Sequence, residues 1–495
     1  MEVLFSFFAD PWLMVMVCVG TVCGILVGAM PGLTGAMLIA LSLPLTFSMS
    51  SASAMVLLIS MYVGSVSGGL VTATLLKIPG TPASMMTTFD GYPLAQKGQA
   101  NRALGLGVVA SFVGGLIGWV FLILLSAPLA KLSLMLGPFE YFSLVLVALV
   151  LIGAVSGKSI WRGLFAGFMG LAFALPGVDP ANGTPRLTFG FAAMEDGLKL
   201  LPVLIGLFAI SQVMQDIARS PETGEALQTG SGGRLRSFLD SGKHLVNLGR
   251  SSIIGTFVGI LPGVGANIGS VVAYSTAKSF SKRPEDFGHG SEEGIIASEA
   301  ANNASVGGAL IPLFAMGIPG SVIDAILLGA LTIHGLQPGP LLIEQNPQLF
   351  GIVMVAFLFA NLAMCLIMLA AAPHLALLAR IPKSILSPTI LTLCVLGSFA
   401  LANRMFDVWI MLAMGALGLI MNRLRIPLAP FVIGFVLAPV AESHLTEGLM
   451  QSGGSWLPLI TRPVSIVLIL AAVVLFVVSI IQNIRLHRTI GTPDN

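Results

Sequence analysis

Four polar side chains interrupt the apolar sequence between residues 294 and 324. Two are the ionisable residues Glu299 and Asp324, and two are the adjacent amides Asn302 and Asn303. Carboxylate and amide oxygens can bind a cation, and amide N–H groups can bind a carboxylate. We therefore expect Glu299, Asn303 and Asp324 to bind a cation, and Asn302 and Asn303 to bind an anionic substrate. Glu299 could instead lie shallow enough for its carboxylate to reach the polar surface.

The same stretch contains a break, Gly317-Ile-Pro-Gly-Ser321, in an otherwise apolar run. Pro and Gly release backbone amides and carbonyls from helical hydrogen bonding. The free amides at the start of the second half of such a helix act as about half a positive charge, which suits an anion. We therefore add Gly320 and Ser321 to the candidate substrate residues. The structural alternative for Ser321 is a hydroxyl that bonds back to a carbonyl of its own helix.

The composition places these residues in a membrane. The chain has 495 residues, of which 56% are hydrophobic and 9% charged, against about 25% charged in a soluble domain. Apolar runs of about 20 residues recur along it, and each can span about 30 Å of hydrocarbon. We predict an all-α polytopic membrane protein with about 11–12 transmembrane segments. The N-terminus lacks the basic region of a cleavable signal peptide, so the first span should remain in the mature protein.

Two motifs occur twice, in the same order. Residues 24–32 and 255–263 share the pattern Gly-xxx-Gly-xx-Pro-Gly, at an offset of 231 positions. Residues 68–81 and 307–321 share a Gly-Gly pair followed by Ile-Pro-Gly and a hydroxyl residue. The four-residue spacing of the glycines also predicts a helix face that another backbone approaches closely. We infer an internal duplication.

The duplication divides the chain into two units and their connections. We predict a first transmembrane repeat at 12–217, a cytoplasmic linker with a surface helix at 218–250, a second transmembrane repeat at 251–444 and an additional transmembrane helix at 459–484. A solvated connector is the alternative for the linker helix. Loops rich in Lys and Arg in one repeat correspond to loops without them in the other. Because basic residues favour the cytoplasmic side, the repeats should have inverted topology, with the N-terminus outside and the C-terminus in the cytoplasm.

The corresponding Pro-Gly breaks, formed by broken or re-entrant helices, extend the candidate site. Their small hydroxyls, amides and freed N–H groups can bind carboxylate oxygens without a fixed buried charge. The further substrate candidates are Pro31, Gly32, Thr34, Gly35, Gly80, Thr81, Gly263, Gly265 and Asn267. Asp90, in Thr87-Thr-Phe-Asp-Gly-Tyr-Pro93, is either a gating or ion-binding residue or part of an Asx-type turn.

No pattern indicates catalysis or a metal centre. The six histidines show no HxxxH or HExxH spacing, and the four cysteines lie in apolar runs without a CxxC pair. We therefore predict no metal site and buried free thiols. The sequence has no Walker A or GxSxG motif. We expect neither an enzyme, nor a bound cofactor, nor a nucleic-acid-binding protein.

Five motifs carry a family resemblance. They are Gly28-Ala-Met-Pro-Gly-Leu-Thr-Gly35, Ile78-Pro-Gly-Thr-Pro82 with Asp90-Gly-Tyr-Pro93, Gly259-Ile-Leu-Pro-Gly-Val-Gly-Ala-Asn267, Glu299-Ala-Ala-Asn-Asn-Ala304 and Gly317-Ile-Pro-Gly-Ser321. In this order they resemble the large membrane (permease) subunit of the bacterial tripartite tricarboxylate transporters. The resemblance covers essentially the whole chain. Ala266 and residues 268–270 depart from the family pattern, and differences in substrate are expected there.

The resemblance implies a secondary active transporter of the bacterial inner membrane. It implies import of di- or tricarboxylates, coupled to a Na+ or H+ gradient, together with a small four-span membrane subunit and a periplasmic solute-binding protein. On that view, the cation at Glu299, Asn303 and Asp324 is the coupling ion. The alternative is a passive organic-anion channel, which would need a continuous polar lining or charged rings. The spans show neither.

Overall fold

The structure is a computed structural model, and it describes residues 2–30, 32–155, 159–179, 183–218, 236–263, 265–375, 383–400 and 402–490. Within this part of the chain the only sheet is a short antiparallel pair, β1 (Gly177–Val178) with β2 (Pro185–Arg186). Eight of the described helices are long and apolar enough to cross a membrane, and five shorter apolar helices accompany them. The predicted all-α polytopic membrane fold is confirmed.

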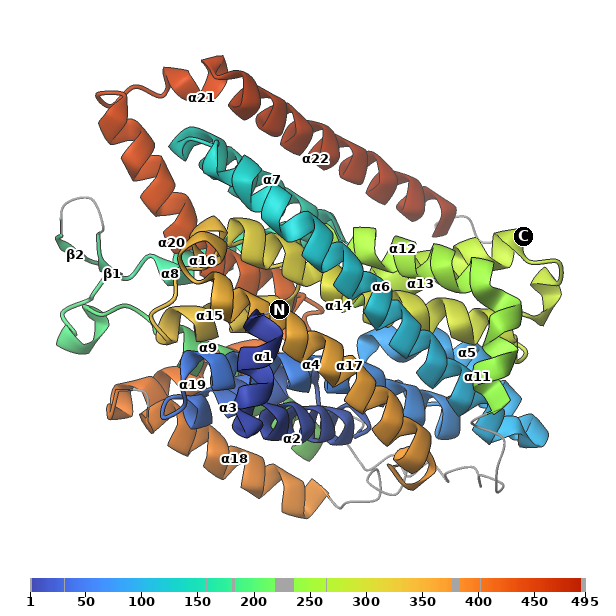
Figure 1. Cartoon of the computed structure of the whole chain (residues 1–495). Coiled ribbons are helices and arrows are strands. Elements are labelled where there is room, and N and C mark those ends of the chain that lie inside the picture. Colours follow the sequence, from blue (N-terminus) through green and yellow to red (C-terminus); the bar gives the residue numbers. More distant parts are fainter. Residues whose placement is uncertain are drawn as a thin grey trace.

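The first repeat contains most of the helices drawn in blue and green in Figure 1. They are α2 (Pro11–Gly28), α3 (Gly35–Thr46), α4 (Ser51–Leu75), η1 (Pro82–Ser84), α5 (Met85–Leu94), η2 (Ala95–Gln99), α6 (Ala100–Leu134), α7 (Pro138–Val155), α8 (Ile160–Ala174), η3 (Ala192–Met194), α9 (Leu200–Leu204), η4 (Ile205–Ile210) and α10 (Ser211–Ala218). A short helix, α1 (Glu2–Ala9), precedes them.

The second repeat follows a linker that contains α11 (Arg236–Ser241) and η5 (Gly242–His244). Its elements are α12 (Leu245–Ile260), α13 (Gly265–Phe280), η6 (Pro284–Asp286), α14 (Glu292–Met316), α15 (Val322–Ile333), α16 (Pro340–Gln345), α17 (Pro347–Leu375), α18 (Lys383–Ala400), α19 (Met405–Arg423) and α20 (Leu428–Gln451). The chain continues through α21 (Leu457–Thr461) to α22 (Pro463–Ile490), which lies beside α7 (Figure 1). Residues 219–235 of the predicted linker lie outside the described residues.

In the first repeat the chain reverses at its first Pro-Gly break. Gly20 lies against Leu57 in α4, and Gly28 lies against Ser65, so α2 and α4 run parallel. Only residues 47–50 connect the end of α3 to the start of α4, so α3 must return in the opposite direction. The contacts also confirm the predicted glycine face, because a Cβ at Gly28 would meet the backbone of Ser65.

The second repeat has the same hairpin. Gly255 lies against Ala301, and Gly259 lies against Ser305, so α12 runs parallel to α14. The returning helix α13 runs antiparallel to α14, since its Ser270 donates a hydrogen bond to the carbonyl of Ser298 at 3.2 Å, while the next turn of α13 approaches the start of α14. Both Pro-Gly breaks are therefore the tips of helical hairpins.

Corresponding helices of the two repeats make reciprocal contacts with the other repeat. Helix α6 packs on α14 and α17 packs on α4, while α13 packs on η1 and α15 packs on α3. The corresponding helices α6 and α17 run antiparallel where they meet, because Trp119 donates to the carbonyl of Met354 at 2.8 Å and Gly115 lies against Asn361. Antiparallel counterparts with reciprocal partners are what an inverted duplication produces.

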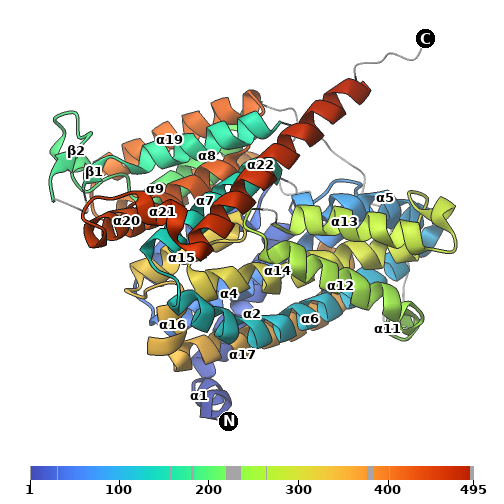
Figure 2. The ribbon, with the colours of Figure 1, turned by 90° about the horizontal axis from the view of Figure 1, so that it is seen from above.

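The pair α4 and α14 forms the centre of the molecule. In Figure 2, α8, α19 and α20 lie on one side of this pair, and α6, α12 and α17 lie on the other. All residues of α4 from Ser53 to Leu75 are buried, as are nearly all residues of α14. Polar side chains on these two helices are therefore shielded from both water and lipid.

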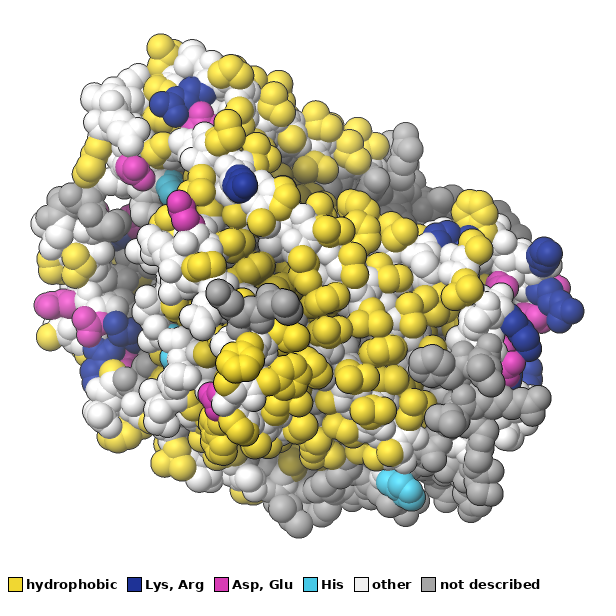
Figure 3. All heavy atoms as spheres, in the orientation of Figure 1, with side chains coloured by type: hydrophobic (Ala, Val, Ile, Leu, Met, Phe, Trp, Pro, Cys, Tyr) yellow, Lys and Arg dark blue, Asp and Glu magenta, His cyan; other side chains and the backbone are white. Residues whose placement is uncertain are grey.

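The outer surface fits a membrane. Apolar side chains cover the middle of the face shown in Figure 3, and charged side chains gather at its two ends. On α22, exposed apolar residues include Val467, Leu470 and Val474. An apolar belt this broad is far larger than the patches that soluble proteins expose to water. Lipid chains are its natural environment.

Candidate functional site

The two breaks of each repeat touch each other. In the second repeat, the backbone N–H of Gly263 donates to the carbonyl oxygen of Gly320 at 2.8 Å. In the first repeat, a Cβ at Gly80 would meet the carbonyl oxygen of Gly28. Positions 80 and 320 therefore accept only glycine because another backbone lies against each. The two broken elements of each repeat therefore meet at these contacts.

Three helix starts converge around Ser321, the N-cap of α15. Its hydroxyl accepts the N–H of Asp324 at 3.3 Å and is paired with the hydroxyl of Tyr62 from the first repeat at 3.2 Å. Gly265, which begins α13, lies beside the Ser321 side chain. Gly35, which begins α3, lies against Ile323. Each helix start contributes about half a positive charge, so this junction is suited to an anion.

Glu299 is fully buried in the middle of this core. Its carboxylate accepts hydrogen bonds from the hydroxyl of Thr87 at 2.5 Å and from that of Ser111 at 3.2 Å. Thr87 is also paired with Ser298 at 3.0 Å. Glu299 therefore does not reach the surface, and both of its oxygens have hydroxyl partners supplied by the first repeat.

The two adjacent amides have different surroundings. Asn303 accepts a hydrogen bond from Ser67 at 2.6 Å and donates to the carbonyl of Glu299 at 3.2 Å. Asn302 donates weakly to the carbonyl of Val66 at 3.4 Å, and its side-chain oxygen is buried without a hydrogen-bond partner. Asn303 thus links the two central helices, while Asn302 retains a free acceptor.

Asp324 is the least compensated carboxylate of the core. It lies in the first turn of α15 and is fully buried. Ser321 and Tyr62 are polar residues beside it, but neither carboxylate oxygen accepts a hydrogen bond. A buried carboxylate without partners is strongly destabilising unless a charge or a proton compensates it.

Asp90 does not form the local turn that its motif allows. It lies inside α5, fully buried, and accepts the hydroxyl of Tyr274 at 2.8 Å. It also accepts the backbone N–H groups of Gly288, Gly290 and Ser291 at 2.8, 2.9 and 2.8 Å. The Asx-type turn is therefore wrong, since the carboxylate binds the loop before α14 and not its own turn. Asp90 holds the second repeat against the first.

The remaining candidates are distributed around this core. Thr34 caps α3 by accepting the N–H of Met37 at 3.2 Å. Gly32 has a φ of +92° and faces α10. Asn267 is exposed on α13 and is not brought together with the buried amides. Pro31 lies outside the described residues.

Several partners of these residues were not predicted as site residues. Tyr62, Ser67 and Ser111 lie on α4 and α6 and reach the second repeat's polar side chains. A tyrosine in the middle of an apolar helix was a usable signal, because a buried phenol needs a hydrogen-bond partner. Ser67 and Ser111 gave no such signal, since serine in a membrane helix commonly bonds to its own backbone.

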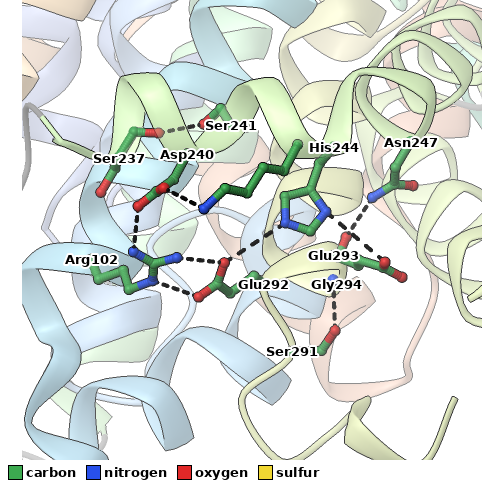
Figure 4. Close-up of polar contacts among 11 residues, drawn as sticks. Arg102, Ser237, Asp240, Ser241, His244, Asn247, Ser291, Glu292, Glu293 and Gly294 are labelled. Atoms are coloured by element: carbon green, nitrogen blue, oxygen red, sulfur yellow. Dashed lines mark hydrogen bonds and ion pairs between the residues drawn. The ribbon is translucent and has the colours of Figure 1, made fainter. Parts of the chain in front are cut away.

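An ion-pair cluster outside the apolar core joins α6, α11, η5 and α14 (Figure 4). Arg102 on α6 binds Glu292 at the start of α14 through two nitrogens, at 2.5 and 2.9 Å, and Asp240 on α11 at 2.7 Å. Lys243 binds the other oxygen of Asp240 at 2.8 Å, and the Nε2 atom of His244 lies 3.8 Å from Glu292. Hydrogen bonds from Lys243 and Arg102 lower the pKa of Asp240 to about 2. The cluster fastens the linker helix to both repeats.

No group of three or more His, Cys, Asp or Glu residues that could hold a metal ion occurs in the part of the chain that the structure describes. No Lys or Arg is among its buried polar residues. The site can therefore bind an anion through helix starts, amides and hydroxyls. It can bind a cation through carboxylate and hydroxyl oxygens. Duplicated helical hairpins that meet around such a core are typical of membrane transporters.

Comparison with known proteins gives the family. A sequence model described as Tripartite tricarboxylate transporter TctA family matches residues 14–433. The chain is 31% identical over 474 residues to the Agrobacterium vitis protein named "Uncharacterized 52.8 kDa protein in TAR-I ttuC' 3'region", which covers 95% of this chain and 93% of that protein. The chain belongs to the TctA family of tripartite tricarboxylate transporters, as the sequence motifs predicted.

A second relative covers part of the chain. The Agrobacterium vitis protein named "Uncharacterized protein in TAR-II ttuC' 3'region" is 33% identical over 234 residues, 47% of this chain and 97% of that protein. No solved structure matches. Family membership makes the chain a transporter component of a tripartite system.

Proposed function

We propose that this chain is the large membrane subunit of a system that imports di- or tricarboxylates by secondary active transport, coupled to a Na+ or H+ gradient. The observation that carries the proposal is the junction at Ser321. The starts of α3, α13 and α15 converge there, next to Asp324 and the hydroxyl of Tyr62. Membership of the TctA family supports the same function.

The substrate residues of this proposal belong to the breaks and to the central amides. Backbone amides at the helix starts would bind the carboxylates, and hydroxyls and amide groups would fix their orientation. Asn302 is suited to this role because its buried side-chain oxygen is free to accept a hydrogen bond, for example from a hydroxyl group of the substrate. Glu299, Asn303 and Asp324 are the proposed residues for the coupling ion.

The proposed partners are a small four-span membrane subunit and a periplasmic solute-binding protein. The proposed location is the bacterial inner membrane, with the N-terminus in the periplasm and the C-terminus in the cytoplasm. This orientation places the cluster around Arg102 on the cytoplasmic side, as the preference of basic residues for that side requires. Cysteine labelling at the two termini in right-side-out vesicles tests the orientation.

The experiment that tests the function is uptake of labelled carboxylates into vesicles that contain this chain and its small membrane subunit. A panel of citrate, succinate, tartrate and an aromatic carboxylate is offered with and without a sodium gradient, a proton gradient and the solute-binding protein. Accumulation that requires a gradient and the binding protein is the expected result. Equilibration that needs neither would instead identify a passive organic-anion channel.

A further inference from the structure

The buried carboxylates of Asp90, Glu299 and Asp324 are compensated very unequally. Asp90 accepts four hydrogen bonds, and Glu299 accepts two from hydroxyl groups. Asp324 accepts none, although it is equally buried. Desolvating a carboxylate costs several kcal/mol, on the order of what a native protein has as its whole net stability. The partner of Asp324 must therefore be something that binds there.

The surroundings of Asp324 identify the chemistry of that partner. The neighbouring polar groups are the hydroxyls of Ser321 and Tyr62, which offer oxygen lone pairs. No histidine, cysteine or second acid joins Asp324 in a metal-binding group within the described residues. Softer metals prefer nitrogen and sulfur ligands, and Ca2+ usually collects several carboxylates. A site with one carboxylate and neutral oxygens suits a monovalent alkali cation.

The net charge at the junction explains why binding of the substrate depends on binding of the cation. Three helix starts supply about half a positive charge each, and Asp324 removes one charge. The remainder is too small to hold a substrate with two or three carboxylates, and no Lys or Arg is buried within the described chain. One added cation restores the positive potential at the place where the substrate would lie.

We propose that a sodium ion binds between the Asp324 carboxylate and a carboxylate group of the substrate, with Ser321 and Tyr62 as further oxygen ligands. This inference rests on the proposed function, and among the proposed coupling-ion residues it makes Asp324 the carboxylate that binds the ion directly. Cation and substrate share ligands in this arrangement, so each raises the affinity for the other by the same factor. Glu299, whose two oxygens are occupied by Thr87 and Ser111, holds α14 to the first repeat.

A proton is the less suitable partner at this position. Protonation would neutralise Asp324 but would leave its second oxygen without a donor, since neither Ser321 nor Tyr62 donates to it. A metal ion satisfies both oxygens at once.

The test measures sodium binding to the purified complex of this chain and its small membrane subunit. Thermal unfolding is followed in NaCl against choline chloride at equal ionic strength, because a ligand of the folded state raises the apparent Tm. Sodium should raise the Tm of the wild type. Asp324→Asn should raise the half-saturating sodium concentration by more than about tenfold. A sodium response of Asp324→Asn equal to that of the wild type overturns the proposal.

A second variant keeps the proposal testable if Asp324→Asn does not fold. Asp324→Ser introduces the residue that the first repeat carries at the corresponding position, Ser84. It should fold without a sodium response, and the matched control Ser84→Ala should keep the response. A sodium response in Asp324→Ser equal to that of the wild type overturns the proposal.

The link between cation and substrate is measured with the carboxylate that the uptake panel selects. Saturating carboxylate should lower the half-saturating sodium concentration of the wild type several-fold and leave Asp324→Ser unchanged. Sodium binding that no carboxylate alters contradicts the shared site. If sodium binds at Asp324 but no carboxylate is transported, the proposed function fails while the cation site stands, so the two failures are distinguishable.

Discussion

The Ile-Pro-Gly breaks of the two repeats, at residues 78–80 and 318–320, share a sequence motif but are followed by side chains of different chemistry. In the first repeat, Ser84 accepts the N–H of Thr81 at 3.2 Å and donates to its carbonyl at 2.8 Å, which closes the helix start. In the second repeat, the corresponding residue is Asp324, whose carboxylate has no hydrogen-bond partner. Both helix starts are capped by a hydroxyl residue, but only the second repeat places an unpartnered carboxylate in the first turn.

The central helices differ in the same way. Glu299, Asn302 and Asn303 on α14 correspond, at the offset of the Gly-Gly pairs, to Ser60, Val63 and Gly64 on α4. The first repeat instead supplies hydroxyl groups to the second, from Ser67 to Asn303 and from Thr87 to Glu299. The duplication thus preserved the scaffold, while the ionisable groups are concentrated in one half.

The largest effect should come from removing an amide that joins the two repeats. Asn303→Ala removes the acceptor of Ser67 and the donor to the Glu299 carbonyl, and an unpaired buried polar group costs about 1–3 kcal/mol. We expect carboxylate uptake to fall by about a hundredfold, with the protein still inserted. The control is Val63→Ala, at the apolar position of α4 that corresponds to Asn302, which should retain most of the uptake. Normal uptake by Asn303→Ala would remove this residue from the site.

Substitutions at the close helix contacts should destabilise both repeats equally, whereas substitutions of the polar site residues should not. Gly28→Ala and Gly259→Ala each push a methyl group into the backbone of the neighbouring helix, at Ser65 and Ser305. Each should lower the free energy of unfolding by about 1–3 kcal/mol, measured by thermal unfolding in detergent. Gly249→Ala, where a Cβ meets open space, should instead stabilise α12 by about 0.5–1 kcal/mol. A large loss in only one repeat would show that the hairpins are not equivalent.

A smaller effect should follow from opening the closed helix start of the first repeat. Ser84→Ala removes the reciprocal hydrogen bonds with Thr81, which contribute on the order of 1 kcal/mol in such caps. We expect a modest decrease in Tm and an unchanged dependence of uptake on sodium. A changed sodium dependence would mean that the first repeat also binds the coupling ion.

The smallest effect concerns the linker helix α11. The pKa of Asp240 is lowered to about 2 by Lys243 and Arg102, so its contribution is complete above its unfolded value of about 4 and is lost as the pH falls from there towards 2. Limited proteolysis of the linker at pH 5 and pH 3 should show faster cleavage at pH 3. Asp240→Asn should cleave at the faster rate at both values. An equal rate for the wild type at both pH values would contradict a role for this ion pair.

The sequence was sufficient for the architecture because that architecture depends on local patterns. The glycine spacing of residues 20–28 predicted the close approach of α2 and α4, and the Pro-Gly motifs predicted the breaks. The buried acids were also recognisable, since Glu299 and Asp324 stand alone in apolar runs. Their partners were not, because the hydroxyls that bind Glu299 lie about 190–210 residues away in the chain.

Asp90 shows why a motif alone was insufficient. Its sequence, Asp-Gly-Tyr-Pro, favours a local turn, but the carboxylate binds backbone groups almost 200 residues away in the loop before α14. Asn267 belongs to a predicted break, and it is exposed on α13 while Asn302 and Asn303 are buried. In both cases tertiary packing decided which polar group faces the core.

The most direct test is a structure of the complex, solved by electron cryomicroscopy with sodium and the transported carboxylate present. The comparison of the two repeats predicts density for the carboxylate at the start of α15, beside Tyr62 and Ser321, with a cation peak at Asp324. Carboxylate density at the corresponding break of the first repeat, beside Thr81 and Ser84, and none at α15 would contradict the account.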